Sequence, residues 1–237
     1  MTGAPTAGRG AVLLTGGTSR RMGVDKATLL VGGVPLAWRV ARALAAVGGP
    51  VVEVGPGAVP WLPVAREEPP GAGPLAGLVA GWSWLAAIGV EGPVVVAACD
   101  LPRLSTRTVR WLLERPGSGS VVPVLGGRPQ PLCARWSGSA LARAALALAA
   151  GERSLRPLLR DPETTLVPVD DWPEEKRVEL VDADRPEDLA GLGPLGPGPV
   201  EAGSVEVGSG GTGSSGARGL DRPAAPADTV RFGNPRR

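Results

Sequence analysis

The chain has 237 residues, of which 43% are hydrophobic, so it can bury the core of one large domain or of two small ones. Its formal net charge is only +2 and its basic residues form no run, which gives no indication of nucleic acid or an anionic membrane as a partner. Histidine is absent, and this excludes Ser-His-Asp catalysis, Cys-His catalysis and a His-ligated metal site. Any catalysis must therefore use carboxylates, cations, hydroxyl groups or a hard metal ion bound by oxygen, such as Mg²⁺.

The sequence contains neither a membrane-span pattern nor a secretion-signal pattern. No apolar stretch reaches the roughly 18 residues that a span needs, and residues 1–10 have no apolar signal core. We therefore expect a cytoplasmic protein with a flexible N-terminus over residues 1–10. Cys99 and Cys133 are too few for a disulfide framework or a Cys-rich zinc site, and we expect both to be small buried side chains.

The first predicted element is a buried strand over residues 11–14, a short apolar run that a glycine pair follows, although periodicity alone does not exclude a helical turn. Gly16 and Gly17 have no Cβ atom, so the turn that leaves the strand can bring its backbone N–H groups close to an anion. Arg21 and Lys26 add positive charge to the same segment, which suits a polyphosphate. The segment matches neither the P-loop nor the dinucleotide-binding glycine pattern, and a tight turn with solvated arginines is the alternative.

An amphipathic helix is predicted over residues 36–47, because apolar side chains recur there at helical spacing after Pro35. Residues 51–54 then form a second apolar strand. Strand, helix and strand make a β–α–β unit with parallel strands, and such sheets bind ligands at the carboxyl ends of the strands. The turn that carries the glycine pair lies at that edge.

Acidic residues and a glycine-rich helix start follow the second strand. Residues 64–65 are predicted as a brief edge strand, Glu67 and Glu68 come next, and a helix is expected from Gly73 to about residue 87. The glycines allow a base or a ribose to approach this helix start, although such a start is also common for purely structural reasons.

The strongest strand pattern is the valine-rich run at residues 93–99, which leads to Asp100. A carboxylate at the carboxyl end of a central parallel strand faces the same edge as the glycine pair and is well placed to hold Mg²⁺. The alternative is that Asp100 caps a helix, because Pro102 follows two positions later. Ser105 is predicted to cap the next helix, over residues 106–114.

The remaining predicted elements are short. Strands are expected over residues 121–125, 132–136, 166–169 and 178–181, a helix over residues 139–150, and an acidic loop over residues 170–176. The carboxylates of Asp182 and Asp184 point the same way on an extended chain and can share a cation, unless Asp184 only caps a helix that begins at Pro186. Gly, Pro, Ser and Ala dominate residues 193–237, which predicts a disordered tail.

Five blocks stand out when the chain is taken as a whole. They read GGTSRRMGVDKA from Gly16, GPLAG from Gly73, CDLP from Cys99, ERSL from Glu152 and DADRPEDL from Asp182. In this order they resemble the signature of nucleotidyltransferases, and most of all that of the molybdenum cofactor guanylyltransferase family. The resemblance implies a single α/β domain over residues 11–192 with a Rossmann-like nucleotidyltransferase fold, in which helices flank a mostly parallel central sheet.

The same resemblance implies transfer of GMP from GTP to the terminal phosphate of molybdopterin, with Mg²⁺ as cofactor and release of pyrophosphate. The implied catalytic residues are Arg21, Lys26 and Asp100. The residues implied to bind GTP are Leu14, Thr15, Gly16, Gly17, Lys26, Glu67, Glu68, Gly73 and Asp100. The residues implied to meet the acceptor are Arg128, Gln130, Arg153, Asp182 and Asp184, and the implied metal ligands are Asp100 and Asp184. A plain hairpin turn at Arg128 and Gln130, and surface salt bridges at Arg153, are the alternatives.

The expected nucleotide also follows from the resemblance. A glycine pair at the positions of Gly16 and Gly17 is typical of family members that use a guanine nucleotide, whereas related cytidylyltransferases tend to have Ala-Gly. Gly55-Pro56 stands where the family often has an Asn-like residue, so that a guanine contact is either lost or supplied by the backbone. The alternatives are a cytidylyltransferase, a sugar-phosphate nucleotidyltransferase or a non-catalytic carrier of the cofactor. The implied partners are GTP, molybdopterin or Mo-molybdopterin, and a molybdoenzyme or cofactor-delivery protein.

Overall fold

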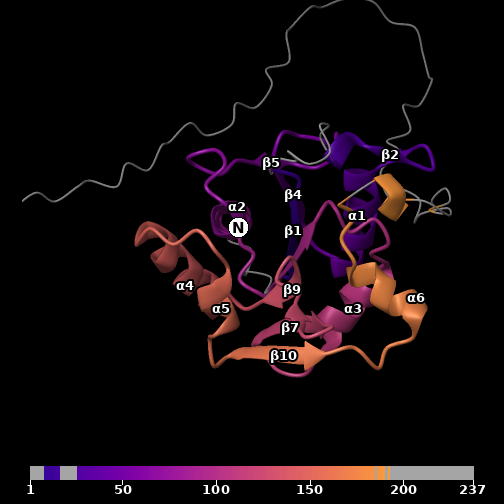
Figure 1. The fold of residues 1–237 in the computed structure, drawn as a ribbon. Coiled ribbons are helices and arrows are strands. Elements are labelled where there is room, and N and C mark those ends of the chain that lie inside the picture. Colours follow the sequence, from indigo (N-terminus) through magenta and orange to yellow (C-terminus); the bar gives the residue numbers. More distant parts are fainter. Residues whose placement is uncertain (1–7, 17–25, 185, 190–191, 193–237) are drawn as a thin grey trace, which may run out of the picture. The chain divides into compact units, whose positions relative to one another are not determined.

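The computed structural model describes residues 8–16, 26–184, 186–189 and 192. The strands of its central sheet are β1 (Gly10–Leu14), β4 (Val51–Val54), β5 (Val64–Ala65), β6 (Val94–Ala98), β7 (Ser120–Leu125), β8 (Arg128–Pro129), β9 (Cys133–Trp136) and β10 (Thr164–Pro168). Within the described residues they form an eight-stranded sheet in the order β10-β7-β9-β6-β1-β4-β5, with β8 paired to β7 (Figure 1). A separate hairpin consists of β2 (Leu30–Val31) and β3 (Val34–Pro35).

Helices cover both faces of the sheet (Figure 1). The α-helices are α1 (Leu36–Leu44), α2 (Pro74–Ala87), α3 (Thr106–Glu114), α4 (Gly138–Ala149), α5 (Arg156–Leu159) and α6 (Glu174–Arg177), and the 3₁₀ helices are η1 (Lys26–Thr28), η2 (Ala45–Val47), η3 (Val178–Leu180) and η4 (Pro186–Leu189). Side chains alternate along β1, so that Ala11 and Leu13 join the core under α1 and α3, whereas Val12 and Leu14 join the core under α2 and α4. The predicted α/β architecture with a mostly parallel sheet between helices is thereby confirmed.

The order of the strands reverses at β1. This strand pairs in parallel with β4 on one side and with β6 on the other. The chain reaches β4 through α1 on one face of the sheet, and it returns to β6 through α2 on the other face. Ligands of open α/β sheets bind beside the carboxyl ends of the strands at such a reversal. Thr15 directly follows β1 and Asp100 lies just beyond β6, so both belong to this edge.

Glycines allow α2 to lie close to the sheet. A Cβ atom at Gly81 would come within 2.6 Å of Val12, and one at Gly77 would lie 3.2 Å from Leu14. Because Gly77 is in the first turns of α2 and Leu14 is the last residue of β1, the start of α2 lies beside the carboxyl edge of the sheet.

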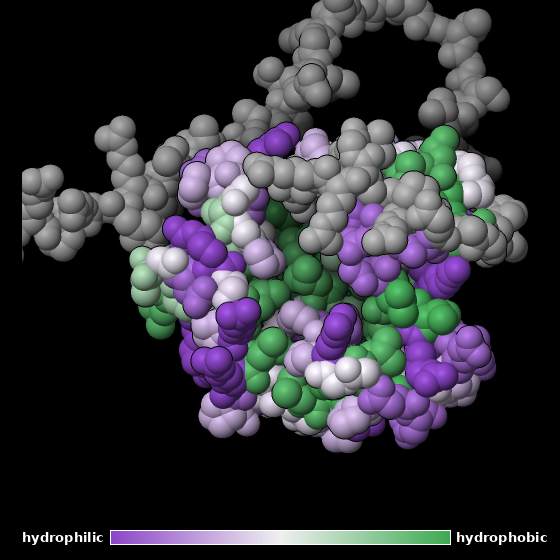
Figure 2. Space-filling model, viewed as in Figure 1, coloured by the Kyte–Doolittle hydropathy of each residue, from purple (hydrophilic) through white to green (hydrophobic). Residues whose placement is uncertain are grey.

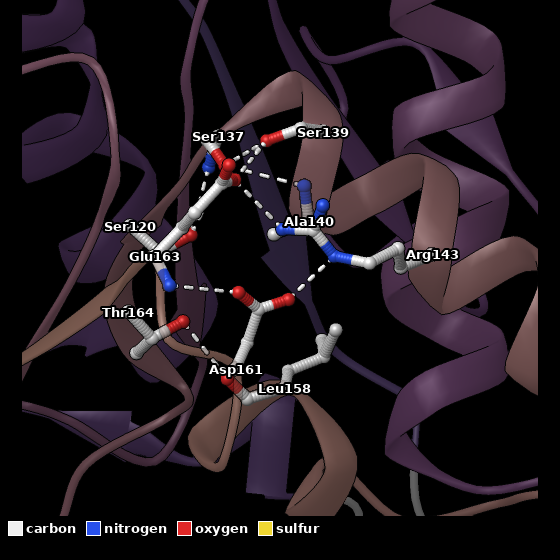
Figure 3. A network of polar contacts seen from close by, with 9 residues as sticks. All are labelled: Ser120, Ser137, Ser139, Ala140, Arg143, Leu158, Asp161, Glu163 and Thr164. Carbon is white, nitrogen blue, oxygen red and sulfur yellow. Dashed lines mark hydrogen bonds and ion pairs between the residues drawn. The ribbon is translucent and has the colours of Figure 1, made fainter.

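A polar network holds the opposite edge, where β7 and β10 begin and β9 ends (Figure 3). The Arg143 guanidinium pairs with the carboxylates of Asp161 and Glu163, and the Ser139 hydroxyl donates to Glu163 at 2.8 Å. Ser137 caps α4 by accepting a backbone N–H group of its first turn at 3.2 Å. These contacts tie α4 to the edge strand β10 and lie at the end of the sheet away from Thr15 and Asp100.

One predicted strand is wrong. At residues 178–181 the structure has the 3₁₀ helix η3, which directly follows α6, and α6 begins inside the predicted acidic loop. The helical turn buries Leu180 and lets the Glu179 carboxylate accept the backbone N–H group of Ser105 at 3.0 Å. The other predicted strands and helices are found with small shifts at their ends, and the helix predicted over residues 36–47 continues from α1 into η2.

The described helices include none with the length and apolar character that a membrane crossing requires. Residues 1–7 of the predicted flexible N-terminus and the whole predicted tail lie outside the described residues.

Candidate active site

Four charged side chains meet at the edge where β1 and β6 end. Lys26, the first residue of η1, places its Nζ atom 2.7 Å from Asp184 Oδ1 and 3.8 Å from Asp100 Oδ2. Asp182 joins them, because one carboxylate oxygen from each of the three aspartates lies within 4.8 Å of the others. We call Lys26, Asp100, Asp182 and Asp184 the charged cluster. The sequence-based expectation that Lys26 and Asp100 share one edge of the sheet is confirmed.

Two segments that are distant in the sequence supply the aspartates. Asp100 follows β6, and Asp182 and Asp184 follow η3. Their backbones are joined, since the Ala183 N–H group donates to the Asp100 carbonyl at 2.8 Å. The Ala183 side chain is buried between its two acidic neighbours. The segment that carries Asp182 and Asp184 is thus fixed against the end of a central strand.

The oxygen atoms of the charged cluster fit a hard divalent cation. Carboxylate oxygens are the protein ligands that Mg²⁺ prefers, and here three carboxylates converge within 4.8 Å. Three carboxylates and one ammonium group also leave an excess of negative charge, which favours a further cation.

Burial and neighbouring charges shift the acid–base behaviour of the charged cluster. Burial raises the pKa of Asp100, the Lys26 ammonium opposes this shift, and the negative charge of Asp182 adds to it. Burial lowers the pKa of Lys26, but the hydrogen bond to Asp184 and the charges of the aspartates outweigh burial, so that the pKa of Lys26 is raised. Lys26 therefore stays positively charged at neutral pH and stabilises the ionised form of Asp100.

Asp100 does not cap α3, which was the alternative for this residue. That helix begins at Thr106 and its N-cap is Ser105, whose hydroxyl accepts the Thr108 N–H group as predicted. The Asp184 carboxylate accepts a hydrogen bond from Lys26, while the Asp184 N–H group donates to the Asp188 carboxylate at 2.9 Å. Both aspartates therefore direct their carboxylates to the charged cluster.

A further carboxylate lies beside Thr15 and Gly16, the first residues beyond β1, and is wholly buried. Glu53 of β4 is 0% exposed, and its Oε1 atom accepts the Thr15 hydroxyl at 2.6 Å. Its two oxygens also accept the backbone N–H groups of residues 57–59. Sequence reasoning misses this residue, and the one local signal is a charge within a valine strand. We call Glu53, Thr15 and residues 57–59 the Glu53 network.

The first residues beyond β1 form backbone hydrogen bonds with β4. The backbone N–H groups of Thr15 and Gly16 donate to the Val54 carbonyl at 3.0 and 3.2 Å. A phosphate bound by these two groups would have to replace the bonds to Val54, so their role toward GTP stays a prediction. Leu14 is buried at the end of β1, and Gly17 and Arg21 lie outside the described residues.

Of the two predicted acidic ligands near α2, Glu67 has the better position. Its side chain is partly buried, and its Oε1 atom accepts the Gly71 N–H group at 2.7 Å, whereas Glu68 is exposed. Its Oε2 atom lies 3.6 Å from the place that a Cβ atom would take at Gly77, in the first turns of α2. Gly73 precedes this helix with a φ of 98°, a left-handed conformation that favours glycine.

The predicted acceptor ligands outside the charged cluster have other local roles. Arg128 is exposed on β8, which forms a hairpin with β7, and Gln130 Nε2 donates to the Arg128 carbonyl at 3.2 Å. The Arg153 guanidinium donates to the carbonyls of Leu148 and Glu152, next to the end of α4. The hairpin alternative is confirmed as a structure, and a role of these side chains toward an acceptor stays a prediction.

The face of the molecule seen in Figure 2 is hollowed over the sheet. Hydrophobic surface forms much of the floor of this hollow, and both hydrophilic and hydrophobic residues lie along its coloured rim. Binding sites for small molecules commonly combine an apolar lining with a few charged or polar groups, and a planar ring suits such a floor.

The chain also matches known proteins in sequence and in fold. The family model for the MobA-like NTP transferase domain matches residues 11–167. A probable molybdenum cofactor guanylyltransferase of Opitutus terrae is 36% identical over 195 residues, which cover 74% of this chain and 90% of that protein. A molybdenum cofactor guanylyltransferase of Cereibacter sphaeroides is 38% identical over 151 residues, 60% of this chain and 75% of that protein.

Among solved structures, molybdopterin-guanine dinucleotide biosynthesis protein A of Archaeoglobus fulgidus has a similar fold. Its TM-score is 0.62 at 23% identity, and the match covers 76% of this chain and 94% of that one. At this level of identity the likeness concerns the fold alone.

Proposed function

The chain belongs to the MobA-like NTP transferase family, and on that premise we propose that it transfers GMP from GTP to the terminal phosphate of molybdopterin and releases pyrophosphate. The observation that carries the proposal is the charged cluster, in which Lys26 and three aspartates converge beside the reversal of the strand order. Nucleotidyl transfer needs charge neutralisation and alignment more than it needs a protein nucleophile, and this suits a chain without histidine.

In the proposed reaction, an oxygen of the molybdopterin phosphate forms a bond to the α-phosphorus of GTP. The bond from that phosphorus to the oxygen that bridges to the β-phosphorus breaks, and pyrophosphate leaves with its electron pair. The attacking phosphate is already ionised at neutral pH, so no general base is required. The protein contributes alignment of the two phosphates and compensation of their negative charge.

Lys26 is the proposed ligand of the triphosphate. Its pKa is raised, so that it carries a positive charge throughout the neutral range. Since its Nζ atom lies 2.7 Å from Asp184, binding a phosphate requires Lys26 to exchange or share that partner. Asp100, Asp182 and Asp184 are the residues that would hold Mg²⁺. When bound there, Mg²⁺ neutralises phosphate charge that the ammonium group of Lys26 leaves uncompensated.

Guanine is the proposed base, because the relatives described above carry the name guanylyltransferase and Gly16 belongs to the glycine pair. Glu67 is its proposed ligand, since a carboxylate can accept hydrogen bonds from the N–H groups of guanine. Arg128, Gln130 and Arg153 remain proposed acceptor ligands. We also propose that the protein is cytoplasmic. The proposed recipient of its product is a molybdoenzyme or a cofactor-delivery protein.

The decisive assay measures pyrophosphate release from GTP, CTP, UTP and dTTP, each with Mg²⁺ and with or without molybdopterin. We expect release only with GTP, molybdopterin and Mg²⁺ together. A preference for CTP would make the protein a cytidylyltransferase, and release with a sugar phosphate in place of molybdopterin would make it a sugar-phosphate nucleotidyltransferase. No release with any pair of substrates would indicate a carrier.

A further inference from the structure

The Glu53 network joins the two segments that leave β1 and β4. Glu53 Oε1 accepts hydrogen bonds from the Thr15 hydroxyl at 2.6 Å, from Gly57 N–H at 2.9 Å and from Ala58 N–H at 2.7 Å. Its Oε2 atom accepts Val59 N–H at 2.9 Å. A carboxylate that is removed from water is costly unless its oxygens receive hydrogen bonds, and here fixed donors from both segments supply them.

The two segments also touch directly. A Cβ atom at Gly55 would overlap the Thr15 hydroxyl and would lie 2.8 Å from Gly16 N, so that only glycine allows this approach. Thr15 and Gly16 both donate their N–H groups to the Val54 carbonyl. The first residues beyond β1 therefore take their position from β4 and from the Glu53 carboxylate.

We infer that Glu53 is a positioning residue for nucleotide binding. Through Thr15 it fixes the first residues beyond β1, and through residues 57–59 it fixes the segment beginning at Gly55-Pro56. Glu53 is fully buried and acts on a ligand only through these segments. It is not part of the charged cluster, so we expect nucleotide binding to respond to its loss and the chemical step to be spared. This inference rests on the proposed function.

The test compares the variants Thr15→Val and Thr108→Val. The first removes the hydroxyl that donates to Glu53 and keeps the shape of the side chain. The second removes the hydroxyl of another buried threonine, on α3, whose Oγ1 atom has no hydrogen-bond partner among the described residues. We expect Thr15→Val to raise the KM for GTP about tenfold, the effect of a hydrogen bond to a charged group, with little change in kcat. We expect Thr108→Val to leave both parameters close to those of the wild type.

Two further variants separate positioning from a loss of stability. Thr15→Ser keeps a hydroxyl and should bring the KM back toward the wild-type value. Glu53→Gln places an amide group against backbone N–H donors and should raise the KM further. Because Thr15 acts through Glu53, the double variant should bind GTP no more weakly than Glu53→Gln alone. Thermal unfolding of each variant shows whether the fold is retained.

The inference is overturned if Thr15→Val and Thr108→Val have the same KM, if kcat falls while the KM stays constant, or if the effects of Thr15→Val and Glu53→Gln simply add. The dissociation constant of each nucleoside triphosphate with Mg²⁺ is measured alongside by calorimetry. If the wild type binds a triphosphate but does not use GTP, the proposed guanylyl transfer fails, and the variants are compared by the affinity for the triphosphate that binds best. If none binds, the inference about Glu53 fails as well.

Discussion

The carboxylate beside Thr15 and the carboxylates beside Lys26 have different surroundings. In the Glu53 network a fully buried carboxylate receives neutral, fixed donors, namely one hydroxyl and backbone N–H groups. In the charged cluster the aspartates face a lysine, and the side chain of Asp184 is 47% exposed. Neutral donors compensate burial and hold a shape, whereas three carboxylates against one ammonium group leave an imbalance of charge that a ligand can change. We therefore assign a positioning role to the Glu53 network and the catalytic role to the charged cluster.

Removing Lys26 breaks the charged cluster most directly. Lys26→Ala leaves three carboxylates without the ammonium group, and we expect turnover with GTP to fall by about 10²–10³-fold, the usual effect of removing a group that stabilises transition-state charge. The fold should be retained with a lower melting temperature, because three neighbouring carboxylates lose their counter-charge. The matched control is Lys176→Met, since Lys176 Nζ lies over the Trp172 ring, 3.6 Å from its centroid. Pyrophosphate release at the wild-type rate in Lys26→Ala would remove this residue from the mechanism.

Asp100→Asn tests whether the negative charge of Asp100 is needed for activity although it lowers the stability of the fold. We expect activity with Mg²⁺ to fall about 100-fold. Because burial raises the pKa of Asp100 in the folded state, its ionisation weakens the fold as the pH rises above the usual value of 3.8. The free energy of unfolding at neutral pH should therefore be no lower in Asp100→Asn than in the wild type.

Urea unfolding at several pH values without Mg²⁺ measures this difference, with the exposed Asp171→Asn as the control. A variant Asp100→Asn that is both less stable and still active would reverse the assignment of Asp100 to the charged cluster.

Gly55→Ala tests whether the close approach of Gly55 to Thr15 matters for nucleotide binding. Its methyl group would overlap the Thr15 hydroxyl, so the two segments must move apart. We expect a higher KM for GTP, a smaller change in kcat and a lower melting temperature. Gly138→Ala is the matched control, because a Cβ atom there meets Glu91 O at an ordinary 3.5 Å. Equal effects of the two substitutions on KM would contradict the tight approach at Gly55.

Cys133 provides a third kind of buried titratable group. Burial, with a smaller contribution from the charge of Glu179, raises its pKa from 9.0 to about 12. At pH 8 the thiol is neutral, and we expect iodoacetamide to modify Cys133 only after the protein unfolds. The raised pKa also implies that this group weakens the fold as the pH rises from 9.0 toward 12. Peptide mass spectrometry after labelling of the native protein checks the expectation, and rapid native labelling of Cys133 would contradict it.

The elements that the sequence predicts correctly have strong local patterns. The valine run before Asp100 and the Ser105 cap of α3 both specify their structure within a few residues. The approach of Lys26 to Asp100 follows from the rule that the ends of parallel strands share an edge.

The failures have causes that are distant in the sequence. The sequence predicts a strand at residues 178–181, but contacts with the start of α3 and with the core favour a helical turn. The sequence does not predict the role of Glu53, because one of its hydrogen-bond donors, Thr15, lies 38 positions earlier. Its other donors belong to a turn that the strand pattern does not specify. The bonds of Thr15 and Gly16 to Val54 likewise depend on the pairing of β1 with β4.

The assignment of chemistry to the charged cluster is tested most directly by a crystal structure of the protein with Mg²⁺ and a non-hydrolysable GTP analogue. We expect the metal to be bound by Asp100 and at least one of its acidic neighbours, and Lys26 to contact a phosphate oxygen while the bond between Thr15 and Glu53 is retained. A triphosphate bound away from Lys26, with no metal at Asp100, would contradict the account.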